Sequence, residues 1–227
     1  MNVIAHRGAS ADAPENTLQA FELAIEQGAD MIETDLHLAA DGSIPIWHDA
    51  HIQQQPIERL SLAEIRALAP LVPTLQETLE SCGARIPFNL ELKAAASGLY
   101  AGLEERVLRI VREMSRLDRV LFSSFEIPVL RRLRELEPKA RIGVLRSSRF
   151  MRPSAIEEHA RRLSAEAVNP AVRRLERAHV ERLQTLGFRV NVYTVDEPAE
   201  QRRLIDWNVD GIFTNRPAQL RSIVDGN

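Results

Sequence analysis

Glu33 and Asp35 are two carboxylates separated by one residue in the run Met-Ile-Glu-Thr-Asp-Leu. If this run is a strand, both side chains lie on one face, because successive strand side chains alternate. Like charges held close without water are costly, and proton uptake or a cation between them relieves the cost. Glu91 adds a third carboxylate, and three carboxylates without a cysteine cluster favour Mg²⁺ or Ca²⁺, with Mn²⁺ also possible. We therefore predict that Glu33, Asp35 and Glu91 are metal ligands, whereas an isolated pair would more simply mark a strand leaving the core.

His6 and His48 each end a strand-like run beside charged neighbours. Imidazole titrates near neutrality, so two histidines can serve as general base and general acid in one reaction. Either one alone could be an ordinary buried histidine, but together with the carboxylates both are predicted to be catalytic. Asp49 follows His48 and could hold one tautomer of its ring. The remaining histidines are assigned no catalytic role: His37, His51, His159 and His179.

Arg7 and Lys93 bring positive charge to the same groups. The guanidinium of Arg7 is a forked donor suited to phosphate oxygens, and Lys93 shares the strand face of Glu91. Lys93 could bind phosphate, pair with Glu91, or do both. Glu15 stands in a segment that is typical of a loop entering a helix, and it is a further candidate for substrate contact. These residue types together point to metal-assisted cleavage of a phosphodiester.

The elements that must position these residues alternate between short strand-like runs and segments of helical period. Strands are predicted at Val3–Arg7, Met31–Leu36, Phe88–Leu92, Val120–Ser124, Arg141–Leu145, Ala167–Asn169, Arg189–Thr194 and Gly211–Thr214. Helices are predicted at Thr17–Gln27, Leu75–Ser81, Leu99–Arg116, Pro128–Glu137, Pro153–Leu163, Arg173–Leu186, Pro198–Trp207 and Pro217–Ile223. Eight such pairs favour an α/β fold of the (β/α)8 TIM barrel type, in which the strand ends meet at one face. An open doubly wound sheet is the alternative, but the His6-Arg7-Gly8 turn lacks its glycine-rich phosphate loop.

One excursion interrupts the alternation after the second strand. Asp41-Gly42 is a turn signal, and Ile44–His48 is predicted to be the returning strand of a hairpin. The segment 51–73 is predicted to be a short insertion with one helix at Ser61–Leu68, capped by Ser61. This insertion is too small for a domain, so residues 1–227 are predicted to form a single domain.

Composition argues against several classes of partner. The chain has 29 Lys plus Arg and 32 Asp plus Glu, and its net charge of −3 gives no general attraction to nucleic acid or anionic membranes. No apolar stretch approaches the roughly 20 residues of a membrane span, and the first residues lack the basic flank of a signal peptide. Cys82 is the only cysteine and cannot form an internal disulfide. A soluble, cytoplasmic protein is expected, and its oligomeric state is left open.

In their order along the chain, the motifs resemble those of the glycerophosphodiester phosphodiesterase family. They are His6-Arg7-Gly8, Pro14-Glu15-Asn16-Thr17, Glu33-x-Asp35, Asp41-Gly42, His48-Asp49, Glu91-Leu92-Lys93, Asn191-Val192-Tyr193-Thr194-Val195 and the Asp-Gly-Ile-Phe-Thr-Asn-Arg-Pro run at 210–217. The resemblance implies a TIM barrel that hydrolyses small glycerophosphodiesters, such as glycerophosphocholine or glycerophosphoethanolamine, to glycerol 3-phosphate and an alcohol. It also implies a divalent cation on the three carboxylates and acid/base roles for the two histidines. The first nucleophile is left open between water and the glycerol 2-hydroxyl.

Two departures from the family's usual pattern concern the substrate. Members commonly carry a longer insertion with an Arg-Thr-Thr-like element, whereas this chain has a compact segment reading Ile52-Gln53-Gln54-Gln55-Pro56. The head-group preference is therefore left open. Tyr193 stands where many members carry tryptophan, and we expect it to line the glycerol pocket. Phe125 and Leu145 are candidates for the same apolar wall, with ordinary packing an equal alternative for Leu145.

Two other functions are weighed against this one. A lysophospholipase D or phospholipase C-like enzyme acting on lipids would need an exposed apolar entry patch, which the glutamine-rich insertion does not suggest. A non-catalytic barrel that binds phosphate or a partner would be indicated by the loss of a histidine or a carboxylate, and all of these are present.

Overall fold

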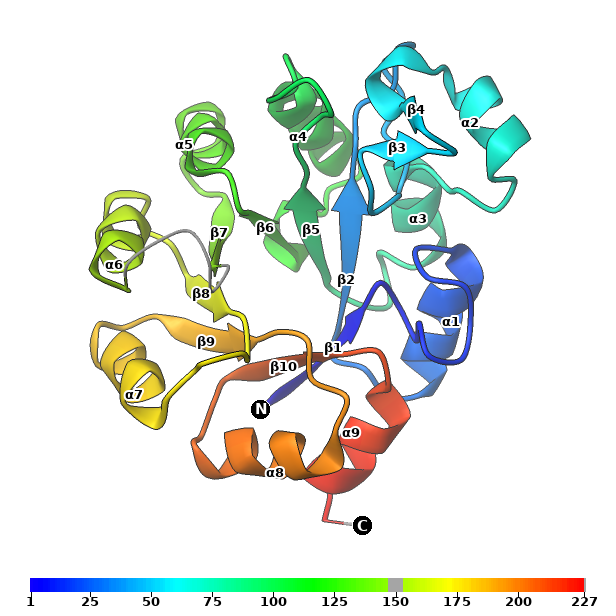
Figure 1. Cartoon of the computed structure of the whole chain (residues 1–227). Coiled ribbons are helices and arrows are strands. Elements are labelled where there is room, and N and C mark those ends of the chain that lie inside the picture. The colour runs from blue at the N-terminus through cyan, green and yellow to red at the C-terminus, as the bar shows by residue number, and fades with distance from the viewer. Residues whose placement is uncertain (147–152, 227) are drawn as a thin grey trace.

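The computed structural model describes residues 1–146 and 153–226. Eight parallel strands close into a barrel in the order β1-β10-β9-β8-β7-β6-β5-β2, and helices surround the barrel (Figure 1). The strands are β1 (Asn2–His6), β2 (Met31–Leu36), β5 (Phe88–Leu92), β6 (Val120–Ser124), β7 (Arg141–Arg146), β8 (Ala167–Pro170), β9 (Arg189–Val192) and β10 (Gly211–Thr214). The helices around them are α1 (Leu18–Glu26), α3 (Leu75–Ser81), α4 (Leu103–Glu113), η2 (Leu117–Arg119), α5 (Ile127–Leu136), α6 (Pro153–Arg162), α7 (Arg177–Thr185), α8 (Pro198–Asp206) and α9 (Pro217–Val224). The predicted (β/α)8 barrel is confirmed.

Two helices begin four residues later than the sequence indicated. The start of α4 is set by Gly102, which precedes the helix with φ at 90°. The start of α7 is delayed because Arg174 has φ at 63°, a left-handed conformation that cannot continue into a right-handed helix. Local backbone geometry therefore overrode helical periodicity at both positions.

The strand predicted at Ile44–His48 is wrong. The segment runs antiparallel to the end of β2 but forms only isolated bridges, one between Leu36 and Ile46 and one between Pro45 and Thr74. The amide of His37 donates to the carbonyl of Pro45 at 3.2 Å. Proline has no N–H with which to return that bond, so the ladder cannot extend. The predicted excursion is present as a loop rather than as a regular hairpin.

The insertion at 51–73 forms a small layer beside β2 (Figure 1). It contains the hairpin of β3 (His51–Ile52) and β4 (Gln55–Pro56), then η1 (Ile57–Arg59) and α2 (Leu62–Leu68). Gln53 and Gln54 have φ of 46° and 69°, as a two-residue hairpin turn of type I′ requires. The sequence analysis missed this hairpin because a Gln-Gln pair lacks the usual Asn-Gly or Asp-Gly signal. The predicted helix is confirmed, and Ser61 caps it in a capping box with Glu64.

The main apolar core lies between the outer face of the barrel and the helices. Phe21 of α1 and Phe88 of β5 are both fully buried and pack edge to face with ring centroids 5.9 Å apart. This layer fixes the strand register without using the residues that point into the barrel. In the described part of the chain, no helix combines the length and the apolar character that crossing a bilayer requires.

Candidate active site

The register of three neighbouring strands brings the predicted residues to one level of the barrel. His6 is aligned with Glu33 across β1 and β2, and Asp35 is aligned with Glu91 across β2 and β5. Because strand side chains alternate, both β2 carboxylates point into the lumen. Each of the three carboxylates has an oxygen within 4.8 Å of the others, and all three side chains are buried. The structure thus assembles the acidic cluster that the sequence predicted.

Burial and mutual repulsion govern the protonation of this cluster. Burial and the charges of Asp35 and Glu91 raise the pKa of Glu33 well above its ordinary value. Burial also raises the pKa of Glu91 to about 7, although Lys93 opposes that shift. Burial acts to raise the pKa of Asp35 too, but Lys93 and Arg7 outweigh it and hold this pKa below its ordinary value. A bound divalent cation would supply the compensation that the cluster lacks.

Two basic side chains flank the carboxylates. The ammonium nitrogen of Lys93 lies 2.7 Å from Glu91 Oε1 and 3.3 Å from Asp35 Oδ1. Arg7 Nε lies 3.3 Å from Asp35 Oδ2, and its Nη1 lies 3.0 Å from Glu15 Oε1. The salt bridge between Lys93 and Glu91, one of the two roles considered for this lysine, is therefore present in the structure.

The tight turn after β1 directs Arg7 at the cluster. Arg7 and Gly8 both have left-handed φ, at 57° and 84°, and a Cβ at Gly8 would lie 2.7 Å from the backbone of Ala20. Only glycine fits there. Asn16 has φ at 57° as well, and its amide donates to Asp35 Oδ2 at 2.9 Å. Two non-glycine residues in a costly conformation thus both hold Asp35 in place.

His6 ends β1 with its ring between the barrel wall and the cavity. Its Nδ1 lies 2.8 Å from Asn215 Oδ1 and its Nε2 lies 3.9 Å from Glu33 Oε2. Burial and the positive charge of Arg7 lower the pKa of His6. The side chain remains 18% exposed, so the ring can still meet a ligand.

His48 reaches the cavity from the loop that replaces the predicted strand. Its Nδ1 lies 2.8 Å from Asp49 Oδ1, which is the contact expected of Asp49. The carbonyl oxygen of His48 lies 3.3 Å from Nε2 of His37, whose Nδ1 lies 2.8 Å from the hydroxyl of Tyr100. A carbonyl only accepts, so Nε2 of His37 donates and Nδ1 accepts from the tyrosine. His37, to which the sequence assigned no catalytic role, therefore supports the backbone beneath a candidate catalytic residue.

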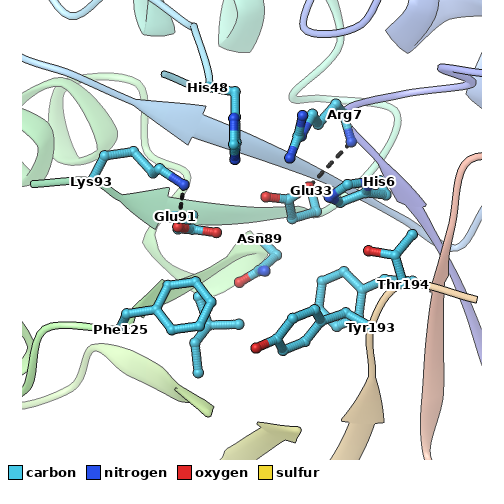
Figure 2. Close-up of a pocket in the computed structure, with 12 residues that line it drawn as sticks. His6, Arg7, Glu33, His48, Asn89, Glu91, Lys93, Phe125, Tyr193 and Thr194 are labelled. Atoms are coloured by element: carbon cyan, nitrogen blue, oxygen red, sulfur yellow. Dashed lines mark hydrogen bonds and ion pairs between the residues drawn. The ribbon is translucent and has the colours of Figure 1, made fainter. Parts of the chain in front are cut away.

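One cavity of about 190 Å³ joins these groups. Figure 2 shows His48, Arg7 and His6 along one side, Glu33 and Glu91 at the centre, and the rings of Phe125 and Tyr193 opposite them. Its lining consists of His6, Arg7, Glu33, His48, Asn89, Glu91, Lys93, Phe125, Leu145, Tyr193, Thr194 and Phe213. The apolar wall proposed from the sequence, including Leu145, is thus in the cavity.

Tyr193 lies at the centre of that apolar wall and contacts two other aromatic rings. Its ring packs edge to face on Phe125 at 6.0 Å and on Phe213 at 6.2 Å between centroids. Its hydroxyl donates to the carbonyl of Arg146 at 2.8 Å. Glu15 does not line the cavity, and its exposed carboxylate pairs with Arg7 instead. Its contact with the site is therefore through this arginine.

Several polar residues around the site were not singled out from the sequence. Asn215 and Asp196 stand behind His6, Asn16 holds Asp35, and Asn89 lines the cavity. Asn16 and Asn215 lie inside quoted motifs, and Asn89 lies two residues before Glu91 on the same strand face. The alternation of side chains in β5 could have indicated that Asn89 points into the barrel. The partners of His6 come from distant parts of the chain, so no local pattern could have indicated them.

The donor set fits a hard divalent cation. The described residues offer three buried carboxylate oxygens close together, which is the ligand type that Mg²⁺ and Ca²⁺ prefer. Burial raises the pKa of both Glu33 and Glu91, and a cation bound between them would favour their ionised forms. Glu33, Asp35 and Glu91 are therefore the residues that would hold such an ion.

Comparison with known proteins agrees with this geometry. Residues 6–219 match the model of the glycerophosphoryl diester phosphodiesterase family. A glycerophosphodiester phosphodiesterase of Caldanaerobacter subterraneus is 32% identical, over 98% of this chain and 97% of the relative. A phosphodiesterase of Oleispira antarctica, solved in complex with the product sn-glycerol-3-phosphate, superposes with a TM-score of 0.85 at 28% identity, over 99% of this chain and 97% of that one. A glycerophosphodiester phosphodiesterase of Thermotoga maritima gives a TM-score of 0.82 at 25% identity, over 98% of both chains.

Proposed function

Because the chain belongs to the glycerophosphoryl diester phosphodiesterase family, we propose that it hydrolyses glycerophosphodiesters such as glycerophosphocholine and glycerophosphoethanolamine. The products are glycerol 3-phosphate and an alcohol, and glycerol 3-phosphate is the product bound to the Oleispira antarctica relative. The observation that carries this proposal is one site that combines three clustered, buried carboxylates with two histidines and two basic side chains, all of which except Asp35 line one cavity.

Glu33, Asp35 and Glu91 hold a divalent cation, Mg²⁺ or Ca²⁺, with Mn²⁺ as a further candidate. When bound, this ion supplies Lewis-acid stabilisation of charge on the phosphate. Arg7 and Lys93 contribute fixed positive charge beside the phosphate oxygens. Such donors need little reorganisation during the reaction, since Arg7 is already held by Asp35 and Glu15.

His6 and His48 move the protons. One ring removes the proton from the attacking hydroxyl, which belongs to water or to the 2-position of the glycerol. The other ring donates a proton to the oxygen of the departing alcohol. If the glycerol hydroxyl attacks first, the resulting cyclic phosphate is hydrolysed with the two roles exchanged. His48 is held by Asp49 and by its own backbone contact to His37.

The two ends of the substrate meet different surfaces. The aromatic wall of Phe125 and Tyr193 offers an apolar face to the glycerol carbons. A second hollow of about 280 Å³ shares His48, Glu91, Lys93 and Phe125 with the first and adds Asp49 and Glu126. Carboxylates beside an aromatic ring suit a cationic alcohol such as choline or ethanolamine, which supports these head groups.

Release of glycerol 3-phosphate from glycerophosphocholine, with and without EDTA, tests the metal. We expect EDTA to abolish release and one of Mg²⁺, Ca²⁺ or Mn²⁺ to restore it. Activity that survives stringent chelation would remove the cation from the mechanism.

His6→Ala and His48→Ala should each lower kcat on the order of 100-fold or more, while His51→Ala in the insertion should leave it unchanged. A near-normal kcat in either cavity variant would exclude that histidine.

One observation in the structure supports a second candidate activity, the hydrolysis of lysophospholipids. A hollow of about 410 Å³ beside the insertion is lined mainly by apolar groups, including Trp47, Pro70, Leu71 and Val72, and Leu71 is 64% exposed. The sequence had not suggested such a patch. If an acyl chain binds here, the protein should release choline from lysophosphatidylcholine, and Leu71→Asp should impair this reaction but not the hydrolysis of glycerophosphocholine. Equal effects on both substrates would reject the lipid assignment.

A further inference from the structure

We propose that Asp196 and Asn215 are positioning residues that fix the tautomer of His6, so that its Nε2 presents a lone pair to the substrate. Neither residue lines the cavity, and each acts through the residue in front of it. The inference rests on the acid/base role proposed for His6. It also explains why Nε2, and not Nδ1, exchanges the proton in the reaction.

The first step is the orientation of the Asn215 side chain. Its Nδ2 lies 2.6 Å from Asp196 Oδ2. A carboxylate only accepts hydrogen bonds, so the NH₂ group of the amide must face Asp196. The reversed amide would place two oxygens against each other and lose this charge-assisted bond. The amide oxygen therefore faces the opposite way, toward His6.

The second step is the ring of His6. Its Nδ1 lies 2.8 Å from Asn215 Oδ1, and an amide oxygen only accepts, so Nδ1 carries a proton. In a neutral imidazole the other nitrogen is then unprotonated. That nitrogen, Nε2, lies on the side of Glu33, at 3.9 Å from its carboxylate. When Nε2 takes a proton, the bond from Nδ1 to Asn215 persists, so the ring need not move during the transfer.

The third step is the rigidity of Asp196. Its Oδ1 accepts from the backbone amide of Asn215 at 2.7 Å and from the hydroxyl of Thr214 at 2.9 Å. Its backbone carbonyl accepts from Gln219 Nε2 at 2.6 Å. Both carboxylate oxygens are thus committed, and the aspartate is tied to the end of β10 and to α9. An anchor fixed in this way can specify the amide orientation rather than follow it.

Ser10 completes the arrangement from the other side. Its hydroxyl lies 2.8 Å from Asn215 Oδ1 and 2.8 Å from the carbonyl oxygen of His6. Its single hydrogen can serve only one of these acceptors at a time. When it points to Asn215, it requires the amide oxygen of Asn215 at this position. With the hydroxyl in that orientation, Ser10 after β1, Asp196 after β9 and Asn215 after β10 are all consistent with one order of donors and acceptors around His6.

The sharpest test reverses that order with near-isosteric changes. In Asp196→Asn, the donors from Asn215 N and Thr214 keep an oxygen at the Oδ1 position, so the new NH₂ group faces the NH₂ group of Asn215. The Asn215 amide then turns over, its NH₂ faces His6 Nδ1, and the ring proton moves to Nε2. We expect kcat on glycerophosphocholine to fall on the order of 100-fold while KM changes less than about 3-fold, because binding is intact and the tautomer is wrong.

The double variant Asp196→Asn/Asn215→Asp should restore function. Its carboxylate at position 215 can only accept, from the new amide on one side and from His6 Nδ1 on the other. The original tautomer returns, and kcat should recover to within about 10-fold of the wild type. A role in folding stability alone would not predict this rescue. Gln219→Leu is the matched control, because it removes a bond to Asp196 without changing the donor and acceptor order.

Nitrogen NMR of protein labelled with ¹⁵N-histidine reads the tautomer directly, at a mildly alkaline pH where the ring is neutral. The His6 signals are those missing from His6→Ala. Nδ1 should be the protonated nitrogen in the wild type, in Gln219→Leu and in the double variant, and Nε2 should be protonated in Asp196→Asn. An unchanged tautomer and kcat in Asp196→Asn would overturn the inference. Normal turnover by His6→Ala would instead overturn the proposed role of His6, whatever the tautomer.

Discussion

The ammonium group of Lys93 lies 2.7 Å from Glu91 Oε1 and 3.3 Å from Asp35 Oδ1. A cationic side chain thus stands among carboxylates that would also hold a metal ion. Burial alone would lower the pKa of Lys93, but the charges of Glu91 and Asp35 outweigh it and raise this pKa above its ordinary value. The lysine therefore stays charged and compensates the acidic cluster when no metal is bound.

Lys93→Met should destabilise the metal-free protein. Removing one partner of a buried ion pair leaves uncompensated charge and costs about 3 kcal/mol or more, so the free energy of unfolding in EDTA should fall by about that amount. Denaturant titrations measure it, with Arg162→Met, which loses an exposed pair with Glu158, as a control expected to change little. Equal, small effects of both substitutions would contradict the compensating role.

Glu33→Gln should stabilise the metal-free protein and greatly weaken its response to cations. The raised pKa of Glu33 means that ionising this side chain in the fold is unfavourable, and the neutral amide removes that cost. The amide oxygen can still accept from the backbone N–H of Arg7, which lies 3.1 Å from the carboxylate.

Thermal unfolding with and without divalent cation checks this prediction. At a concentration about 100 times its dissociation constant, a cation should stabilise the wild type by about 2.7 kcal/mol and the variant by much less. The exposed substitution Glu113→Gln should respond as the wild type does. A full cation response in Glu33→Gln would exclude Glu33 as a ligand.

Because of His37, the free energy of unfolding should decrease as the pH falls from about 6.5 to 4. Burial lowers its pKa from 6.5 to about 4 in the folded protein, so as the pH falls through 6.5 the unfolded chain takes up a proton that the folded chain does not. The contribution of the neutral ring is full above that pH and is lost between about pH 6.5 and 4, at a cost of roughly 3 kcal/mol.

His37→Gln is the matched variant, because its amide can still donate to the carbonyl of His48. The variant should be less stable near neutrality and should lose less stability on acidification, so the two free energies of unfolding converge toward pH 4. Parallel pH profiles from denaturant titrations would show that another group is responsible.

The aromatic wall should act on substrate binding rather than on proton transfer. Tyr193→Phe loses the hydrogen bond to Arg146 but keeps the ring, and it should leave KM within about 3-fold of the wild type. Tyr193→Ala and Phe125→Ala remove apolar surface that faces the cavity and should raise KM about 10-fold or more, in line with roughly 25 cal/mol per Å² of lost burial. Steady-state kinetics with glycerophosphocholine separate these outcomes, and a fall in kcat alone would argue against a binding role.

The sequence by itself determined the eight strands of the barrel and which of their side chains point inward. Alternation in β2 placed Glu33 and Asp35 on one face, and the cap signal at Ser61 marked the start of α2. These features depend on a few consecutive residues, so local pattern is sufficient to predict them. The loop at Ile44–His48 was mistaken for a strand because the pattern did not show that Pro45 would have to donate a ladder bond to His37.

Tertiary structure alone decided what those side chains meet. Parallel register set Asp35 against Glu91, and barrel closure through the pairing of β1 with β10 brought Asn215 to within 2.8 Å of His6 across 209 positions of sequence. Whether Lys93 pairs with carboxylates, and which nitrogen of His6 is free, depend on distances between separate strands. Hydrogen bonds and ion pairs fall off within a few ångströms, so these contacts become defined only when the barrel closes.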